Sequence, residues 1–155
     1  MRATYVWLSR LIALGVVLQA AFIAFGTFDV FRTVDDGKAF TGEYDDYNAG
    51  QALHSIFGTF IIPLLALILL IISFFARIPG GVRFAAIVFG LVVVQFLLAL
   101  LSFATPWVGL LHGINAFALA AVAGFAGRQA TRAPTTAPST PGASGASDAE
   151  ATAAS

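Results

Sequence analysis

The sequence predicts an all-α integral membrane protein: an up-down-up-down four-helix bundle followed by a disordered C-terminal tail. Hydrophobic residues make up 59% of the 155 residues and charged residues only 10%. The mean hydropathy of +0.89 is far from that of a soluble domain. A helix needs roughly 20 apolar residues to cross a bilayer, and four uncharged runs approach or exceed that length, at 11–28, 52–76, 84–104 and 106–127. These runs are apolar on every face, whereas membrane-barrel strands alternate.

The first run follows Arg2 and Arg10 and contains small residues such as Ala20 and Ala24. A cleaved secretory signal has the same features, but its apolar core is shorter, at roughly 7 to 15 residues. We therefore expect a transmembrane helix here, with a cleaved signal as the alternative.

Short connections set the order of the remaining helices. The stretch 77–83 contains Pro79, Gly80 and Gly81, which are typical of a tight turn. Residues 104–107 reverse the chain again, and Pro106 is well placed to begin a helix. The second and fourth helices should therefore lie diagonally across the bundle. Small residues are expected where helices pack closely, namely Gly15, Gly26, Gly58, Gly90, Gly109, Gly113 and Gly124.

Charge predicts the orientation. The side of the two termini carries only positive residues near the spans, namely Arg2, Arg10, Arg77, Arg83, Arg128 and Arg132. The opposite side has Arg32 and Lys38 within an acidic set: Asp29, Asp35, Asp36, Glu43, Asp45 and Asp46. Because short basic loops stay in the cytoplasm, we predict a multi-pass plasma-membrane protein with both termini cytoplasmic. Tyr5, Trp7 and Trp107 are expected at the headgroup level.

After Gly127 the composition changes to Ala, Pro, Thr, Ser and Gly, with prolines at 134, 138 and 141. Such a segment cannot bury enough apolar surface to offset the entropy of ordering. Residues 1–129 are therefore predicted to form the transmembrane domain and 130–155 a disordered cytoplasmic tail, with partner binding by the tail as the alternative.

Several function classes are disfavoured. The chain has no cysteine, which excludes disulfides, thiolate catalysis and cysteine-ligated metals. It has no phosphate-binding glycine loop or hydrolase motif, so nothing points to an enzyme acting on its own. Its few dispersed basic residues do not indicate nucleic-acid binding. No Asp, Glu, Lys or Arg lies within a predicted span, which weakens the case for a transporter.

The only two histidines, His54 and His112, lie one or two turns inside the outer ends of the second and fourth predicted helices. Ionisable residues at membrane depth are functional-site candidates. On diagonal helices the two imidazoles can face each other, as axial haem ligands do. Gly58 and Ala116 follow the histidines by four residues, which leaves room on the same faces for a flat ring. Alternatively, each histidine bonds a backbone carbonyl or interfacial water.

Three amide side chains accompany the histidines. Gln19 and Gln95 lie about 13 Å inside their helices, which places them near mid-membrane and below the histidine layer. They could bond each other, a cofactor edge or a quinone, and interhelical packing is the alternative. Asn115 shares the face of His112 and either orients a ligand or packs against a neighbouring helix.

At these residues the chain resembles two families. Residues 5 to about 129 resemble an uncharacterised family of small four-span bacterial membrane proteins. Its members have a histidine near the start of the second helix and a Leu-His-Gly/Pro-x-Asn-like stretch opening the fourth. Here that stretch is Leu111, His112, Gly113, Ile114 and Asn115. The resemblance implies a fold and a bacterial plasma membrane, but no activity.

The more distant resemblance is to one four-helix half of the haem A synthase proteins, in which paired histidines near the outer face ligate haem. His54 and His112 match that pair. The family has a glutamate three residues before its first histidine, associated with hydroxylation, whereas Gln51 occupies this position here. The second half is also absent. The resemblance therefore implies haem binding rather than catalysis.

Two hypotheses follow. In the first, His54 and His112 ligate a b-type haem for electron transfer or haem carriage, in a pocket with Gln19, Gly58, Gln95, Asn115 and Ala116. A bis-histidine iron has no open position, which disfavours oxygen activation. Zinc is a weaker alternative, because it would need a third ligand such as Asp45 or Asp46. In the second hypothesis the chain binds no cofactor and is a structural or accessory protein that packs with a membrane-protein partner or with itself.

Overall fold

In this computed structural model the described residues, 1–38 and 48–132, form helices joined by turns, and none of them lies in a strand. The elements are α1 (Arg2–Asp35), α2 (Ala49–Ile56), the π-helix η2 (Phe57–Ile61), α3 (Ile62–Ser73), α4 (Gly81–Ala104) and α5 (Val108–Arg132). The elements α2, η2 and α3 form one continuous helical rod. Four helices are therefore long and apolar enough to cross a membrane: α1, this rod, α4 and α5.

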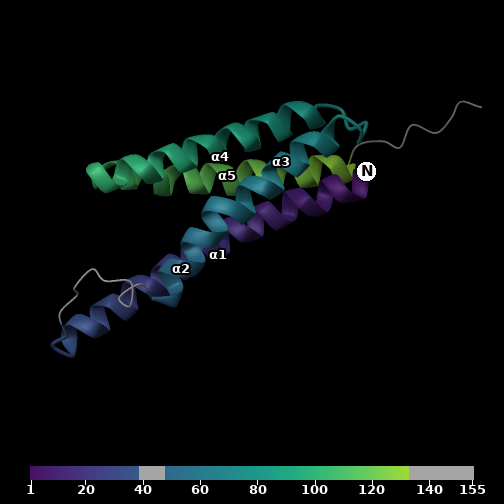
Figure 1. Cartoon of the computed structure of the whole chain (residues 1–155). Helices are drawn as coiled ribbons and strands as arrows, with labels where there is room; N and C mark the ends of the chain where they lie inside the picture. Colours follow the sequence, from purple (N-terminus) through teal and green to yellow (C-terminus); the bar gives the residue numbers. More distant parts are fainter. Residues whose placement is uncertain (39–47, 133–155) are drawn as a thin grey trace, which may run out of the picture.

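Each long helix packs against the next one in the sequence, and the last packs against the first, so the four helices are arranged in a ring. α1 packs on α2 and α3, α3 on α4, α4 on α5, and α5 on α1. Among the described helices, this arrangement leaves the α2–α3 rod diagonal to α5. The start of α1 and the end of α5 lie at the same end of the molecule (Figure 1). There, the Arg2 Nε donates a hydrogen bond of 2.8 Å to the Ala130 carbonyl.

α1 is much longer than the predicted run 11–28. Its 34 residues correspond to about 50 Å of helix, whereas a bilayer core is roughly 30 Å thick. The segments 2–10 and 29–35 contain no glycine or proline, so the helix continues beyond its uncharged centre. It ends just before Gly37, whose φ of 74° places it in the left-handed region and whose N–H bonds the Val34 carbonyl at 2.9 Å.

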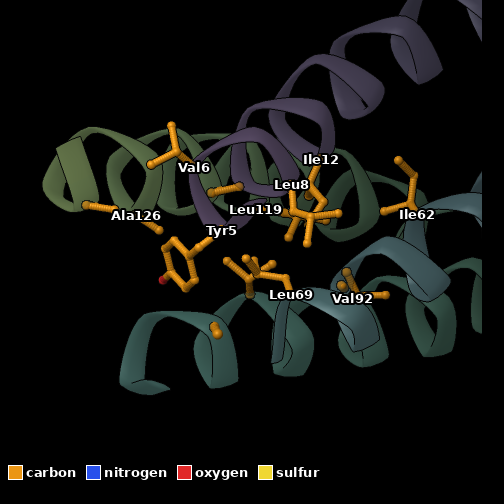
Figure 2. Close-up of a cluster of buried hydrophobic side chains, with 14 of the residues drawn as sticks. Tyr5, Val6, Leu8, Ile12, Ile62, Leu69, Val92, Leu119 and Ala126 are labelled. Atoms are coloured by element: carbon orange, nitrogen blue, oxygen red, sulfur yellow. The ribbon is translucent and has the colours of Figure 1, made fainter. Parts of the chain in front are cut away.

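The buried core lies in the half of the bundle that contains the start of α1. Ile12, Leu69 and Leu119 are almost completely buried and come from α1, α3 and α5 (Figure 2). Tyr5 joins them, with 0% of its surface exposed, and its hydroxyl donates to the Gly81 carbonyl at 2.9 Å. A carbonyl at the start of α4 thus accepts the buried Tyr5 hydroxyl, and the expected headgroup level of Tyr5 stays a prediction. Trp7 and Trp107 are exposed.

Close helix contacts occur at some of the predicted glycines. A Cβ atom on Gly26 would lie 2.8 Å from the Asn48 Oδ1, and one on Gly58 would lie 3.0 Å from the Gln19 Nε2. Gly90 and Gly113 have no neighbour within 4 Å of such an atom, so their predicted role in close packing is wrong. Gly50, which the sequence analysis did not single out, makes the tightest approach, against the backbone nitrogen of Gly26.

Several helix boundaries differ from the predicted runs: the second helical rod begins at Ala49 rather than at 52, α4 at Gly81 rather than at 84, and α5 at Val108 rather than at 106. The second helical rod ends at Ser73 rather than at residue 76, and the turn that follows contains Arg77 and Gly80, with φ values of 50° and 70°. α5 continues to Arg132, past the predicted start of the tail, and Ala130 is buried beside α1. The rest of the predicted tail, 133–155, and the loop acids Glu43, Asp45 and Asp46 lie outside the described residues.

Candidate functional site

Polar side chains from all four long helices come together away from the buried core. They are Gln19 on α1, His54 on α2, Gln95 on α4, and His112 and Asn115 on α5. The imidazoles of His54 and His112 are neighbours, with ring centroids 6.3 Å apart and ring planes at 61°. The two histidines that the sequence analysis placed on diagonal helices therefore face each other.

Gln95 contacts both ring nitrogens of His112. The His112 Nδ1 lies 3.1 Å from the Gln95 backbone carbonyl, and the His112 Nε2 lies 3.0 Å from the Gln95 side-chain nitrogen. A carbonyl can only accept, so Nδ1 carries the proton and Nε2 accepts from the glutamine amide. In this arrangement the imidazole is neutral and its Nε2 lone pair is in use.

Asn115 extends the same network and determines which side-chain atom of Gln95 is the oxygen and which is the nitrogen. Its Nδ2 donates to the Leu91 carbonyl at 3.0 Å and to the Gln95 Oε1 at 2.6 Å. Because the Leu91 carbonyl requires a donor, the Asn115 nitrogen must face Gln95, and the atom it meets there must be oxygen. The Gln95 nitrogen then points to His112. The bonds of Asn115 and the bond to the Gln95 backbone carbonyl therefore indicate the same tautomer of His112.

His54 has a different environment. Its Nδ1 lies 3.0 Å from the backbone carbonyl of Gln19, so Nδ1 donates this hydrogen bond; in a neutral ring the lone pair is then on Nε2. A backbone carbonyl on the far nitrogen is the usual means of orienting a metal-binding imidazole. The side chain is half-buried. The Gln19 carbonyl therefore orients the His54 ring and leaves Nε2 as the nitrogen that would bind a metal.

The Gln19 side chain is buried, with 8% of its surface exposed, and neither its Nε2 nor its Oε1 has a hydrogen-bond partner in the structure. It lies against Gly58, and a methyl group there would meet the amide at 3.0 Å. Gly58 thus makes room for this amide. Ala116 is half-buried and packs against the apolar core. An unpartnered buried amide is costly, which makes Gln19 the polar group of the site most in need of a partner.

The backbone of each glutamine lies closer to a histidine ring than residue counting along the helices suggested. Gln19 and Gln95 were expected below the histidines, but the backbone carbonyl of each lies within hydrogen-bond distance of an imidazole. Counting residues inward from helix ends ignores the reach of a histidine side chain and the stagger between neighbouring helices. Together these cover a difference of about one helical turn, or roughly 5 Å.

Sequence reasoning did not find the π-helix that follows His54. In η2, the Ile62 N–H bonds the Phe57 carbonyl, five residues earlier. Pro63 is the sequence signal that was available, because a proline inside a helix lacks a donor and its ring clashes with the preceding turn. The wider turn just before Pro63 accommodates this irregularity, as π-bulges do. It also sets the rotation of α2, and hence of His54, relative to α3.

The distance between the two imidazoles suits ligation of one shared metal ion. The hydrogen bonds of His112, however, must change before both rings can bind it. With a metal–nitrogen distance of about 2 Å, two imidazoles on opposite sides of one ion have centroids roughly 6 Å apart. However, the Nε2 of His112 is bonded to Gln95, so the amide must turn away before that nitrogen can bind. The described residues contain no group of three or more metal-binding side chains, and Asp45 and Asp46, needed for zinc, lie outside them.

The comparisons with known proteins returned no match, whether with family models, curated proteins or solved structures. The chemistry of the site is therefore inferred from its own residues. It comprises one histidine oriented by a backbone carbonyl, a second histidine held by Gln95, and a buried amide without a partner.

Proposed function

We propose that the chain is a multi-pass protein of a bacterial plasma membrane, an up-down-up-down bundle with both termini in the cytoplasm. The four apolar helices support this placement, and so does the distribution of charge. The end formed by the start of α1, the α3–α4 turn and the end of α5 carries Arg2, Arg77, Arg83, Arg128 and Arg132. All described acids, Asp29, Asp35 and Asp36, lie at the far end of α1. The positive-inside rule makes the basic end cytoplasmic.

We further propose that His54 and His112 are the axial ligands of a b-type haem near the outer face. The 6.3 Å separation of their rings is the observation that carries this proposal. The contact of the His54 Nδ1 with the Gln19 carbonyl supports it, because this contact leaves Nε2 as the nitrogen for the iron. Haem would supply a one-electron redox centre, and with both axial positions occupied by histidine it suits electron transfer or haem carriage. Binding requires Gln95 to release His112, and the Gln19 amide offers a hydrogen bond within the pocket.

The test is optical. The full-length chain, produced with ample haem and purified in mild detergent, should show a Soret band and the bands of a low-spin ferrous haem after reduction. His54→Ala and His112→Ala should each lose haem or convert it to a five-coordinate form. Ser102→Ala is the matched control, because Ser102 lies on α4 and its hydroxyl bonds only its own helix, at the Leu98 carbonyl. A chain without a Soret band, or one whose spectrum is unchanged in both histidine variants, contradicts the proposal.

One observation favours a second function, that of a structural or accessory membrane protein without a cofactor. Both nitrogens of His112 already have protein partners, as expected for a residue that only joins α4 to α5. In that case, His112→Ala lowers the stability of the bundle, and no spectrum distinguishes it from the original chain.

A further inference from the structure

A glutamine on a neighbouring helix orients each histidine of the site in the same way. The His54 Nδ1 lies 3.0 Å from the Gln19 backbone carbonyl, and the His112 Nδ1 lies 3.1 Å from the Gln95 backbone carbonyl. Because a carbonyl oxygen can only accept, both rings donate from Nδ1. The pair formed by α1 and α2 thus repeats the arrangement of the pair formed by α4 and α5.

The side chains of the two glutamines break this equivalence. The Gln95 amide nitrogen lies 3.0 Å from the His112 Nε2, so this amide must turn away before that nitrogen can bind a metal. The Gln19 amide lies against Gly58 and has no hydrogen-bond partner. Gln19 is, through its backbone carbonyl, the one hydrogen-bond partner that the described part of the chain gives the His54 ring. Ligation by His54 therefore needs no side chain to leave.

The residue three positions after each histidine explains the difference. Asn115 follows His112, and its Nδ2 donates to the Gln95 Oε1 at 2.6 Å, which keeps the Gln95 nitrogen on the imidazole. Phe57 follows His54 at the same spacing. Its ring packs edge to face on Phe22, with centroids 5.5 Å apart, and it has no hydrogen-bonding group. Only His112 is therefore held by a glutamine whose amide has its own support.

The histidines also belong to two pairs of helices that separate toward the end of the molecule where they lie. Among the described elements, α2 makes extended contacts only with α1 and with its own rod. In the direction of the histidines, the last buried hydrophobic residues are Val16, Ile62, Val92 and Leu119. Beyond them, α1 and α2 diverge from α4 and α5 (Figure 1). The contact between the imidazoles thus joins two helix pairs that no buried apolar core holds together at this level.

We propose that the two histidines have unequal roles toward haem: His54 is the permanent ligand, and His112 is an exchangeable ligand that Gln95 takes back. The inference rests on the proposed haem binding and names haem carriage as the use of the site. When His112 binds, the hydrogen bond from the Gln95 amide breaks and an iron–nitrogen bond forms. Release reverses both changes, and no electron is transferred. A haem held by His54 alone, between diverging helix pairs, is free to pass to an acceptor.

The experiment follows haem binding to the full-length protein in mild detergent by stopped-flow absorption. The original chain should give a first phase with the spectrum of a five-coordinate haem and a slower second phase that forms the six-coordinate, low-spin haem. His112→Ala should keep the first phase and lose the second. His54→Ala should bind haem about threefold more weakly than His112→Ala, the effect of one interhelical hydrogen bond in a membrane. The combined variant His54→Ala, Gln95→Leu should recover that affinity, because it frees the His112 Nε2.

Asn115→Leu tests the support of the Gln95 amide. It should make the second phase about threefold faster, because the amide loses its hydrogen bond to Asn115. Gln129→Leu is the matched control, since its amide donates to the Pro79 carbonyl at the other end of the bundle, and both phases should be unchanged. Thermal unfolding without haem shows whether each variant is folded. An Asn115 with a purely structural role would alter the unfolding temperature and leave both rates as they are.

Transfer of haem to apomyoglobin tests carriage itself. Gln95→Leu should transfer its haem about threefold more slowly than the original chain, because nothing then competes for the His112 Nε2. Equal haem affinities of His54→Ala and His112→Ala, or an unchanged second phase in Asn115→Leu, would overturn the unequal roles while haem binding stands. Unchanged transfer by Gln95→Leu would overturn carriage through His112. Absence of a Soret band in the original chain would instead remove the haem proposal, and this inference with it.

Discussion

Gln95 holds both ring nitrogens of His112, one through its backbone and one through its side chain. Asn115 bonds the remaining oxygen of the Gln95 amide, so three polar residues on α4 and α5 satisfy one another. Such interhelical hydrogen bonds contribute about 0.6 kcal/mol on average within a membrane, and at most about 2 kcal/mol. The network is therefore a modest source of stability, but it determines which lone pairs of the site remain available.

Replacing Gln95 separates the two proposed functions. Gln95→Leu removes the donor to the His112 Nε2 and the acceptor for Asn115, and should lower the free energy of unfolding by about 1 kcal/mol. If His112 ligates haem, the freed Nε2 makes haem bind more tightly than in the original chain. Denaturation in mixed detergent micelles measures the stability, and a haem titration measures the affinity.

Gln129→Leu is the control for this substitution. It removes an amide of the same size from the opposite end of the bundle, where Gln129 donates to the Pro79 carbonyl at 3.2 Å. Its haem affinity should equal that of the original chain. A Gln95→Leu chain that unfolds as before would mean that the network contributes nothing, and weaker haem binding by that chain would count against His112 as a ligand.

At the scale of elements, the contact between α1 and α2 depends on two glycines. The backbone of Gly50 lies against that of Gly26, and the Asn48 side chain crosses the same contact to donate to the Gly26 carbonyl at 2.8 Å. Asn48 also caps α2, because its Oδ1 accepts from the Gln51 N–H at 3.0 Å. This junction holds α2 against α1 and thereby brings His54 to the carbonyl of Gln19.

We expect Gly50→Ala to separate the two helices, because a methyl group would overlap the backbone of α1. The cost should be about 1 to 3 kcal/mol in the free energy of unfolding, as for other overpacked contacts. Gly90→Ala is the matched control. A methyl group there meets nothing within 4 Å, so alanine should stabilise α4 by up to about 1 kcal/mol through helix propensity. Equal effects of both variants would show that the Gly26–Gly50 contact is not tight.

The π-helix η2 makes a second prediction at this scale. Deleting Thr59 should restore regular α-helical bonding and rotate α2 by about 100° relative to α3, which moves His54 away from His112. The chain has no cysteine, so the combined variant His54→Cys, His112→Cys can be cross-linked with a short thiol-reactive reagent. Cross-linking should be efficient with the full-length sequence and should fall sharply after the deletion. Undiminished cross-linking would show that η2 does not position α2.

At the scale of the whole molecule, charge distinguishes the two ends of the bundle. Positive residues surround the end where α1 starts and α5 finishes, and the described acids lie at the other end. The histidines lie toward the acidic end, whereas the apolar core lies toward the basic end. The polar site would thus lie nearer to one side of the membrane than to the other.

Orientation can be checked by labelling single cysteines in intact cells with a membrane-impermeant maleimide. Lys38→Cys should react from outside, because Lys38 follows the end of α1 on the acidic side. Thr131→Cys should react only after the membrane is permeabilised, because Thr131 lies beside Arg2 at the basic end. The reverse pattern would invert the topology, and labelling of both positions from outside would contradict the four-span arrangement.

Hydropathy was sufficient to predict four long apolar helices, because the cost of placing polar groups in hydrocarbon depends on composition more than on neighbours. Features that depend on how two helices meet were predicted less well. Tyr5 was expected near a membrane surface, and only the structure shows that it is buried between helices with its hydroxyl on a carbonyl of α4. Gly90 looked like a packing point, whereas Gly50 was overlooked. Residue type alone does not show which face of a uniformly apolar helix turns inward.

The sequence by itself determined the helical class, the number of long apolar helices and the polar residues that merit attention, since each follows from local composition and periodicity. Only the tertiary structure decided that Gln95 occupies the Nε2 of His112 while the Nδ1 of His54 bonds the Gln19 carbonyl. It also decided that Gln19 is buried without a partner. These outcomes depend on the rotation and stagger of helices about their axes. Such displacements of a few ångströms leave hydropathy unchanged but redirect every hydrogen bond.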